Sequence, residues 1–215
     1  MSLGVSGPNS TAAQDTSSTR GQQLLAEVRA ISAEGGKESG DAYAMSLSKA
    51  DLGLLNQALV EEINSSMVIV EEGDFSEAMA SGLPTPDAIN ADGKYASAAV
   101  SACYGPYVRT RYAESSIWPH ERFWTYSQSF QWCTSGGYVT SSTWCSATVG
   151  NTGVGWSFQG HLQYCAVVYG GIGYNTIKFQ SQGSFCAGWG YCAQTAYPWI
   201  AQQGDGYGNY WVWSG

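Results

Sequence analysis

Few side chains in the second half of the chain can carry acid–base chemistry. From residue 95 onward the only carboxylates are Glu114, Glu121 and Asp205, and the histidines of the whole chain are His120 and His161. A glycosidase needs two carboxyl groups that face each other across a cleft, so Glu114 or Glu121 with Asp205 is a candidate pair. His120, next to Glu121, is a candidate general acid or base. Their spacing does not bring these groups together, and we interpret them as weak catalytic candidates.

Other catalytic and metal motifs are missing from the sequence. There is no Gly-x-Ser-x-Gly elbow for a nucleophile and no Cys-x-x-Cys pair for zinc. The turn at Gly204–Asn209 holds too few oxygen ligands for a calcium loop. His161 lies inside a predicted strand, where a histidine with a satisfied hydrogen bond is the usual case. We therefore predict no metal and no cofactor, and we lean against an enzyme.

The cysteines predict an oxidising compartment. An even number confined to one aromatic-rich region is typical of a disulfide framework in secreted proteins. Cys186 and Cys192 are the most plausible local pair, because the intervening residues include Gly188 and Gly190 and can turn tightly. Six free thiols in an intracellular protein are the alternative. Met1–Arg20 lacks the apolar stretch of a signal peptide, so a secreted form requires a signal that this chain does not carry. The six cysteines are Cys103, Cys133, Cys145, Cys165, Cys186 and Cys192.

Aromatic residues are the most informative feature of the sequence. Twelve of the 14 Tyr and all nine Trp lie after residue 100. A core of this size cannot bury all of them, and exposed rings are typical of binding faces. The alternative is that they fill the core and form cross-strand pairs. We predict contacts with a protein or a glycan at the cell exterior through Trp118, Trp124, Trp156, Trp189, Trp199, Trp211 and Trp213.

The net charge of −8 is unevenly distributed. Residues 1–94 contain 14 acidic and five basic side chains, whereas residues 95–215 contain three and four. Nucleic-acid binding needs clustered Lys and Arg, and the longest basic feature is Arg109-Thr110-Arg111. We predict no nucleic-acid partner and no transmembrane segment.

The acidic first part predicts helices. Residues 1–20 read as a disordered tail, and Gly21–Glu34 as a short helix. The clearest helix is Lys49–Ser65, where Ser48 precedes Asp51 in a capping-box-like start. Met67–Val70 is either a short strand or a continuation of that helix. We place the boundary near residue 94, which makes 21–94 an acidic helical region or a pro-segment. The apolar stripe of the clearest helix consists of Leu52, Leu55, Leu59 and Ile63.

Residues 95–215 predict an antiparallel β-sandwich of about seven strands, with disulfides to support a small core. Alternating apolar and polar residues are separated by glycine turns, as at Gly136-Gly137 and Gly170-Gly171. Pro198 interrupts one of the last strands and suggests an edge position. The expected strands are 94–112, 123–133, 138–148, 156–168, 174–185, 195–203 and 207–214.

Several short motifs between residues 123 and 213 resemble a group of small secreted β-rich proteins of filamentous Gram-positive bacteria. The resemblance implies export, disulfides and a β-sandwich, and it carries no established activity and no catalytic residue. In composition alone the chain is also similar to the lactococcin-972-type bacteriocins. The motifs are Phe130-Gln131-Trp132-Cys133, Gly136-Gly137, Val139-Thr140-Ser141, Trp156-Ser157-Phe158-Gln159-Gly160, Ser181-Gln182-Gly183-Ser184-Phe185-Cys186, Cys192, Tyr197-Pro198-Trp199-Ile200 and Gly204-Asp205-Gly206.

Three functions follow from these observations. The first is a secreted, non-enzymatic binding or assembly module with an aromatic β face. The second is a secreted toxin or bacteriocin-like protein in which the acidic region is a pro-segment that masks the β domain. The third is a secreted glycan hydrolase that uses the weak catalytic candidates.

Overall fold

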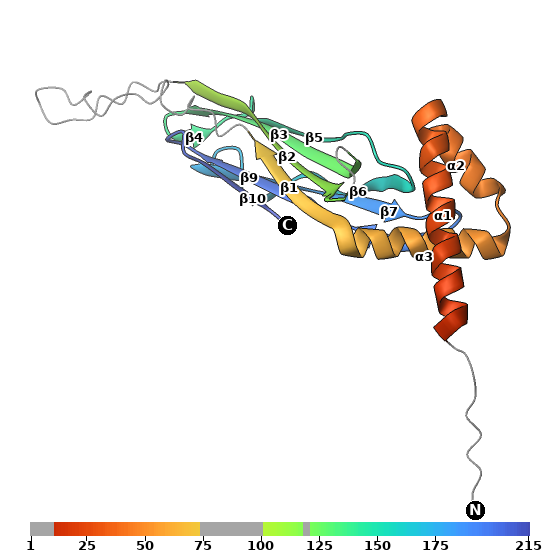
Figure 1. Ribbon diagram of the computed structural model, residues 1–215. Helices are drawn as coiled ribbons and strands as arrows, with labels where there is room; N and C mark the ends of the chain where they lie inside the picture. The colour runs from red at the N-terminus through yellow and green to blue at the C-terminus, as the bar shows by residue number, and fades with distance from the viewer. Residues whose placement is uncertain (1–10, 74–100, 118–120) are drawn as a thin grey trace, which may run out of the picture.

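The computed structural model describes residues 11–73, 101–117 and 121–215. It consists of two antiparallel sheets that face each other, with three helices gathered at one end (Figure 1). The predicted β-sandwich with a helical N-terminal region is therefore confirmed. Trp118 and His120, which the sequence singles out, lie outside the described residues.

The helices are α1 (Thr11–Gly35), α2 (Lys37–Ser46) and α3 (Lys49–Ser66). Helix α1 begins at Thr11, so residues 11–20, predicted as part of a disordered tail, are helical instead. Gly36 separates α1 from α2 with a φ of 82°, a conformation that suits glycine. The predicted cap of α3 is confirmed, because the Ser48 hydroxyl accepts a hydrogen bond from the backbone N–H of Asp51 at 3.1 Å.

Helix α3 runs directly into a strand of the sandwich. Strand β1 (Met67–Gly73) pairs antiparallel with β2 (Ala102–Ser115), from Met67 opposite Ser115 to Gly73 opposite Arg109. Met67–Val70 is therefore a strand, as the first of the two alternatives predicted, and not a continuation of the helix. A segment that composition assigns to the helical region supplies the edge strand of the first sheet.

The first sheet has the order β1-β2-β3-β4, and β5 also pairs with β3. Strand β3 (Arg122–Ser135) is its long central strand, and it pairs with β2 along one edge and with β4 (Tyr138–Val139) and β5 (Trp144–Val149) along the other. The single return strand predicted after the Gly136-Gly137 turn is thus split in two.

The second sheet has the order β10-β9-β7-β6, with β8 paired to β7. Pro198 lies in the break between β8 and β9, and β9 is flanked by β7 and β10. The expected edge position is therefore wrong for β9, whereas β8 pairs with β7 alone, and Pro198 with its missing N–H lies in the break between them. The strands are β6 (Trp156–Gly170), β7 (Thr176–Ala187), β8 (Gln194–Ala196), β9 (Trp199–Asp205) and β10 (Tyr210–Ser214).

Helices and sheets share one hydrophobic core. Leu55, Leu59 and Ile63 of α3, each at most 1% exposed, belong to the same buried cluster as Phe123 and Trp156 of the β region. A smaller aromatic cluster fills the other end of the sandwich, around Trp132. The predicted boundary near residue 94 lies outside the described residues, but the described parts on either side of it are packed together and do not form separate cores.

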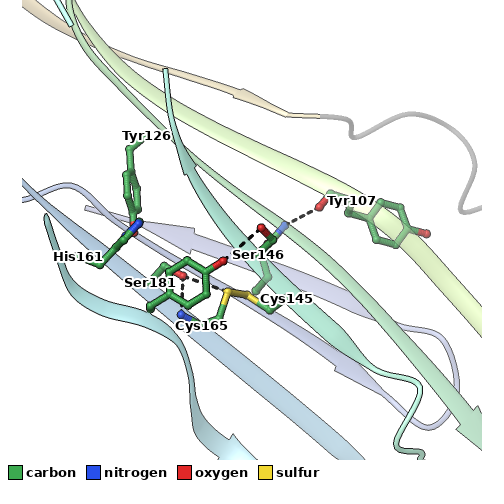
Figure 2. Close-up of a disulfide and its surroundings, with 9 residues drawn as sticks. Tyr107, Tyr126, Cys145, Ser146, His161, Cys165 and Ser181 are labelled. Atoms are coloured by element: carbon green, nitrogen blue, oxygen red, sulfur yellow. Dashed lines mark hydrogen bonds between the residues drawn. A yellow bond between two sulfur atoms is a disulfide. The ribbon is translucent and has the colours of Figure 1, made fainter. Parts of the chain in front are cut away.

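All six cysteines are paired. Cys186 and Cys192 form the predicted local bridge, and Cys103–Cys133 joins β2 to β3. Cys145–Cys165 connects β5 of one sheet to β6 of the other (Figure 2). This last bridge ties the two sheets together along one side of the sandwich.

Candidate binding face on the second sheet

Three of the predicted binding tryptophans are core residues. Trp124, Trp156 and Trp189 are 2%, 1% and 4% exposed. Trp124 stacks on Phe185 with ring centroids 5.5 Å apart, and Trp156 stacks on Phe123 at 6.0 Å. Their prediction as surface contacts is corrected, because the space between the sheets and under α3 is filled by these large rings.

Trp189 fastens the helices to the end of the sandwich. It lies in the loop closed by Cys186–Cys192, and its backbone N–H donates to Asn56 Oδ1 while its carbonyl accepts from Asn56 Nδ2, both at 2.9 Å. Its indole Nε1 donates to Asp41 Oδ1 at 2.7 Å. Asn56 is fully buried, so α3 holds the backbone of Trp189 while Asp41 of α2 holds its indole N–H.

The remaining described tryptophans of the prediction lie together on the outer face of the second sheet. Trp211 and Trp213 are two residues apart on β10, so they point to the same side, and they are 42% and 40% exposed. Tyr210 and Val212 point inward, where Tyr210 stacks on Tyr107 at 4.7 Å.

Trp199 belongs to the same outer face. Trp213 lies opposite Ala201 of β9, and Trp199 is two residues from Ala201 on that strand. Trp199 and Gly215 exchange backbone hydrogen bonds at 2.9 and 3.1 Å, which places Trp199 level with the end of β10. Trp199 is therefore four residues along the strand direction from the level of Trp211, a distance of roughly 14 Å.

Amide side chains occupy the neighbouring positions of this face. The register puts Gln203 of β9 opposite Trp211, Gln180 of β7 opposite Ala201, and Gln182 of β7 opposite Trp199. On β6, Gln163 lies opposite Gln182. The sequence prediction, which relied on aromatic content, did not include these glutamines. The alternation of Lys178, Gln180 and Gln182 with Phe179 and Ser181 could have indicated the polar face of this strand.

The outer face is nearly neutral. Lys178 lies opposite Tyr169 of β6 and Gln203 of β9, and its ammonium lies over the Trp213 ring, 3.9 Å from the centroid. Asp205 ends the same row of β9, but its carboxylate accepts from the backbone N–H groups of Tyr207 and Asn209, both at 2.9 Å. We define the amide–tryptophan face as Trp199, Trp211, Trp213, Gln163, Gln180, Gln182, Gln203, Lys178 and Tyr169.

The candidate catalytic carboxylates do not converge. Glu114 is opposite Arg122 at the start of β3, whereas Trp132 near its end donates from Nε1 to the Asp205 carbonyl at 2.9 Å. Ten residues of strand separate these levels, roughly 33 Å. Asp205 therefore forms no pair with Glu114, nor with Glu121, whose carbonyl accepts from the Ser115 N–H at the Glu114 end of the sheet.

Glu121 belongs to an ion cluster with the helices. Arg29 of α1 donates to both carboxylate oxygens of Glu62, with the Nη1–Oε2 bond at 2.6 Å, and its Nη2 lies 3.2 Å from Glu121 Oε2. Burial raises the pKa of the Glu121 carboxyl, and Arg29 opposes that rise. A groove of about 750 Å³ opens beside this cluster between α1 and α3, lined by residues of the two helices such as Ala26 and Arg29 and by Ile117. Arg29 of α1 thus binds both Glu62 of α3 and Glu121, the residue before β3, so both carboxylates have a structural role.

His161 has the expected hydrogen bond. Its Nδ1 lies 3.0 Å from the hydroxyl of buried Tyr126, and Figure 2 shows the two rings side by side near Cys165. Burial lowers the pKa of His161 and raises the pKa of Tyr126 to about 12. The Ser181 hydroxyl accepts a hydrogen bond from the Cys165 N–H at 3.1 Å and so helps to position the Cys145–Cys165 bridge.

Two further observations concern the described residues only. Within residues 11–73, 101–117 and 121–215, no group of three or more His, Cys, Asp and Glu side chains is arranged to hold a metal ion. In that part of the chain no helix is both long enough and apolar enough to cross a membrane.

Comparison of the chain with protein-family models, with curated proteins and with solved structures finds no match. The resemblance to secreted β-rich proteins of filamentous bacteria therefore stays a prediction.

Proposed function

We propose that this chain is an extracellular binding module whose contact surface is the amide–tryptophan face. The single observation that carries the proposal is the placement of Trp199, Trp211 and Trp213 on one outer sheet surface, with two of them at least 40% exposed. A large ring in contact with solvent does not gain the free energy of burying its apolar surface, so exposed rings that lie next to one another are typical of interaction sites. Three disulfides fit an oxidising exterior.

The two alternative functions receive less support. A hydrolase needs converging carboxylates, and Asp205 is separated from Glu114 by most of the length of β3. A pro-segment that masks the β domain should cover the surface that acts. The helices instead contact the Cys186–Cys192 loop and the end of the sandwich (Figure 1).

An adsorption assay tests the proposal. Purified chain is mixed with insoluble cell-envelope and extracellular-matrix material, and the depleted fraction is measured for the wild type and for Trp211→Ala/Trp213→Ala. We expect the double variant to lose at least tenfold in apparent affinity, because two stacking surfaces are removed. Trp144→Ala is the matched control, since Trp144 is also 40% exposed but lies on β5 of the other sheet. Equal adsorption of the double variant and the control would refute the proposal.

A further inference from the structure

The chemistry of the amide–tryptophan face identifies a ligand class, and this inference rests on the proposed function. We infer that the face binds an uncharged, hydroxyl-rich glycan chain.

The tryptophans provide flat apolar platforms. A pyranose ring presents C–H groups on its two faces, and these faces pack on the electron-rich face of an indole. Trp211 and Trp213 are adjacent same-side positions of β10, and Trp199 continues the line on β9. A ligand that contacts all three must extend roughly 14 Å along the strands, given the rise per residue of a strand. That length requires an oligosaccharide and exceeds a single sugar.

The glutamines provide the polar complement. A side-chain amide offers two N–H donors and a carbonyl acceptor, so it can pair with a hydroxyl in either role. Gln203 lies opposite Trp211, and Gln180 lies opposite Ala201, the residue that is also opposite Trp213. The Gln182 amide donates to the Tyr197 carbonyl at 3.3 Å, which fixes its orientation. A line of rings with amides beside it matches the C–H faces and the hydroxyl edges of the sugar rings in a chain.

The charge of the face excludes ionic ligands. Its only cation is Lys178, whose ammonium lies over the Trp213 ring, and the carboxylate of Asp205 holds the β9–β10 turn. Binding of a polyanion would need several exposed cations, and binding of a basic peptide would need exposed carboxylates. Glu71 of β1 reaches β10, but its carboxylate accepts from the Ser214 hydroxyl and pairs with the Arg109 guanidinium, so it is already neutralised. A neutral ligand is the one that this distribution accommodates at no electrostatic cost.

The experiment is a titration with defined sugars, followed by tryptophan fluorescence and calorimetry. The probes are the neutral hexasaccharides of cellulose, xylan, mannan and chitin, with hyaluronan as the anionic comparison. We expect binding of at least one neutral hexasaccharide, with an affinity that changes less than about twofold when salt is raised tenfold, because screening acts only on charges. Trp213→Ala should weaken binding at least tenfold and Trp144→Ala less than twofold.

A second variant isolates the amides. Gln180→Glu keeps the shape of the side chain but removes its N–H donors and adds a charge, and we expect it to weaken binding about three- to tenfold. All variants are exposed or half-buried positions, and near-ultraviolet circular dichroism verifies that each keeps the wild-type fold.

Failure of glycan binding and failure of the proposed binding function give different results. If no neutral sugar binds while adsorption to envelope material still depends on Trp211 and Trp213, the glycan inference is wrong and a protein partner takes its place. Preferential binding of hyaluronan with steep salt dependence would also overturn it. If neither sugar nor envelope material binds through this face, both the inference and the proposed function fail.

Discussion

Asn56 is the residue whose removal tests how the helices are held to the sandwich. It is fully buried and makes two hydrogen bonds of 2.9 Å to the backbone of Trp189, across a sequence separation of 133 residues. In Asn56→Ala the N–H and the carbonyl of Trp189 stay buried and lose these partners. Each buried polar group without a partner costs about 1–3 kcal/mol. We therefore expect the free energy of unfolding to fall by about 3 kcal/mol.

The assay is urea unfolding with the disulfides intact, followed by tryptophan fluorescence and by far-ultraviolet circular dichroism. In the wild type the two signals should change together, because α3 and the β strands share one core. Gln57→Ala is the matched control on the next position of α3. Gln57 is exposed and donates to Glu61 at 2.9 Å, so its loss should cost less than about 0.5 kcal/mol.

Asn56→Leu distinguishes the lost hydrogen bonds from a simple cavity, because leucine has nearly the shape of asparagine. If the two bonds matter, Asn56→Leu is destabilised about as much as Asn56→Ala. The reasoning is refuted if Asn56→Ala lies within about 0.5 kcal/mol of Gln57→Ala, or if Asn56→Leu is as stable as the wild type.

Two further predictions concern ion pairs. Arg29→Met leaves the carboxylate of Glu62, 8% exposed, without its partner and should lower the free energy of unfolding by about 2 kcal/mol. The double variant Arg29→Met/Glu62→Met should recover part of that loss. Urea unfolding measures both variants, and no recovery in the double variant would contradict the ion-pair account. The Ser214 hydroxyl, which donates to Glu71 at 2.5 Å, and the Arg109 guanidinium hold the pKa of Glu71 below its usual range. A carboxyl group with a lowered pKa stabilises the fold at pH values above its usual pKa, and this contribution is lost as the pH falls through the lowered pKa. The stability difference between the wild type and Glu71→Gln should therefore shrink below about pH 4. A difference that stays constant from neutral to acid pH would contradict this account.

The sequence predicts the β-sandwich because its signals are local. Glycine turns separate the alternating segments, and the residues between Cys186 and Cys192 can turn tightly enough for a bridge. The cap at Ser48 is also local, since the hydroxyl bonds a backbone N–H only three residues away. Features set by interactions within a few residues are therefore the ones that composition and spacing predict.

The division of the tryptophans into core and surface is set by contacts distant in the sequence. Alternation places Trp211 and Trp213 on the same side of β10, but only the packing of Tyr210 on Tyr107 of the other sheet shows that this side faces outward. Trp189 lies beside glycines in a loop, where exposure is the natural expectation. Its burial depends on Asn56 and Asp41 of the helices.

The same contacts determine what the helical region does to the proposed face. Leu59 and Ile63 of α3 pack against the core that contains Phe123 and Trp156, and Asn56 holds the Trp189 loop. Removing the helices would expose these core rings at the end of the sandwich and would leave Trp211 and Trp213 as exposed as before. The helices therefore act on the stability of the sandwich, and access to the amide–tryptophan face does not depend on their release. A binding function through that face is compatible with the docked helices, whereas a masking function for α1, α2 and α3 would require a different docking site.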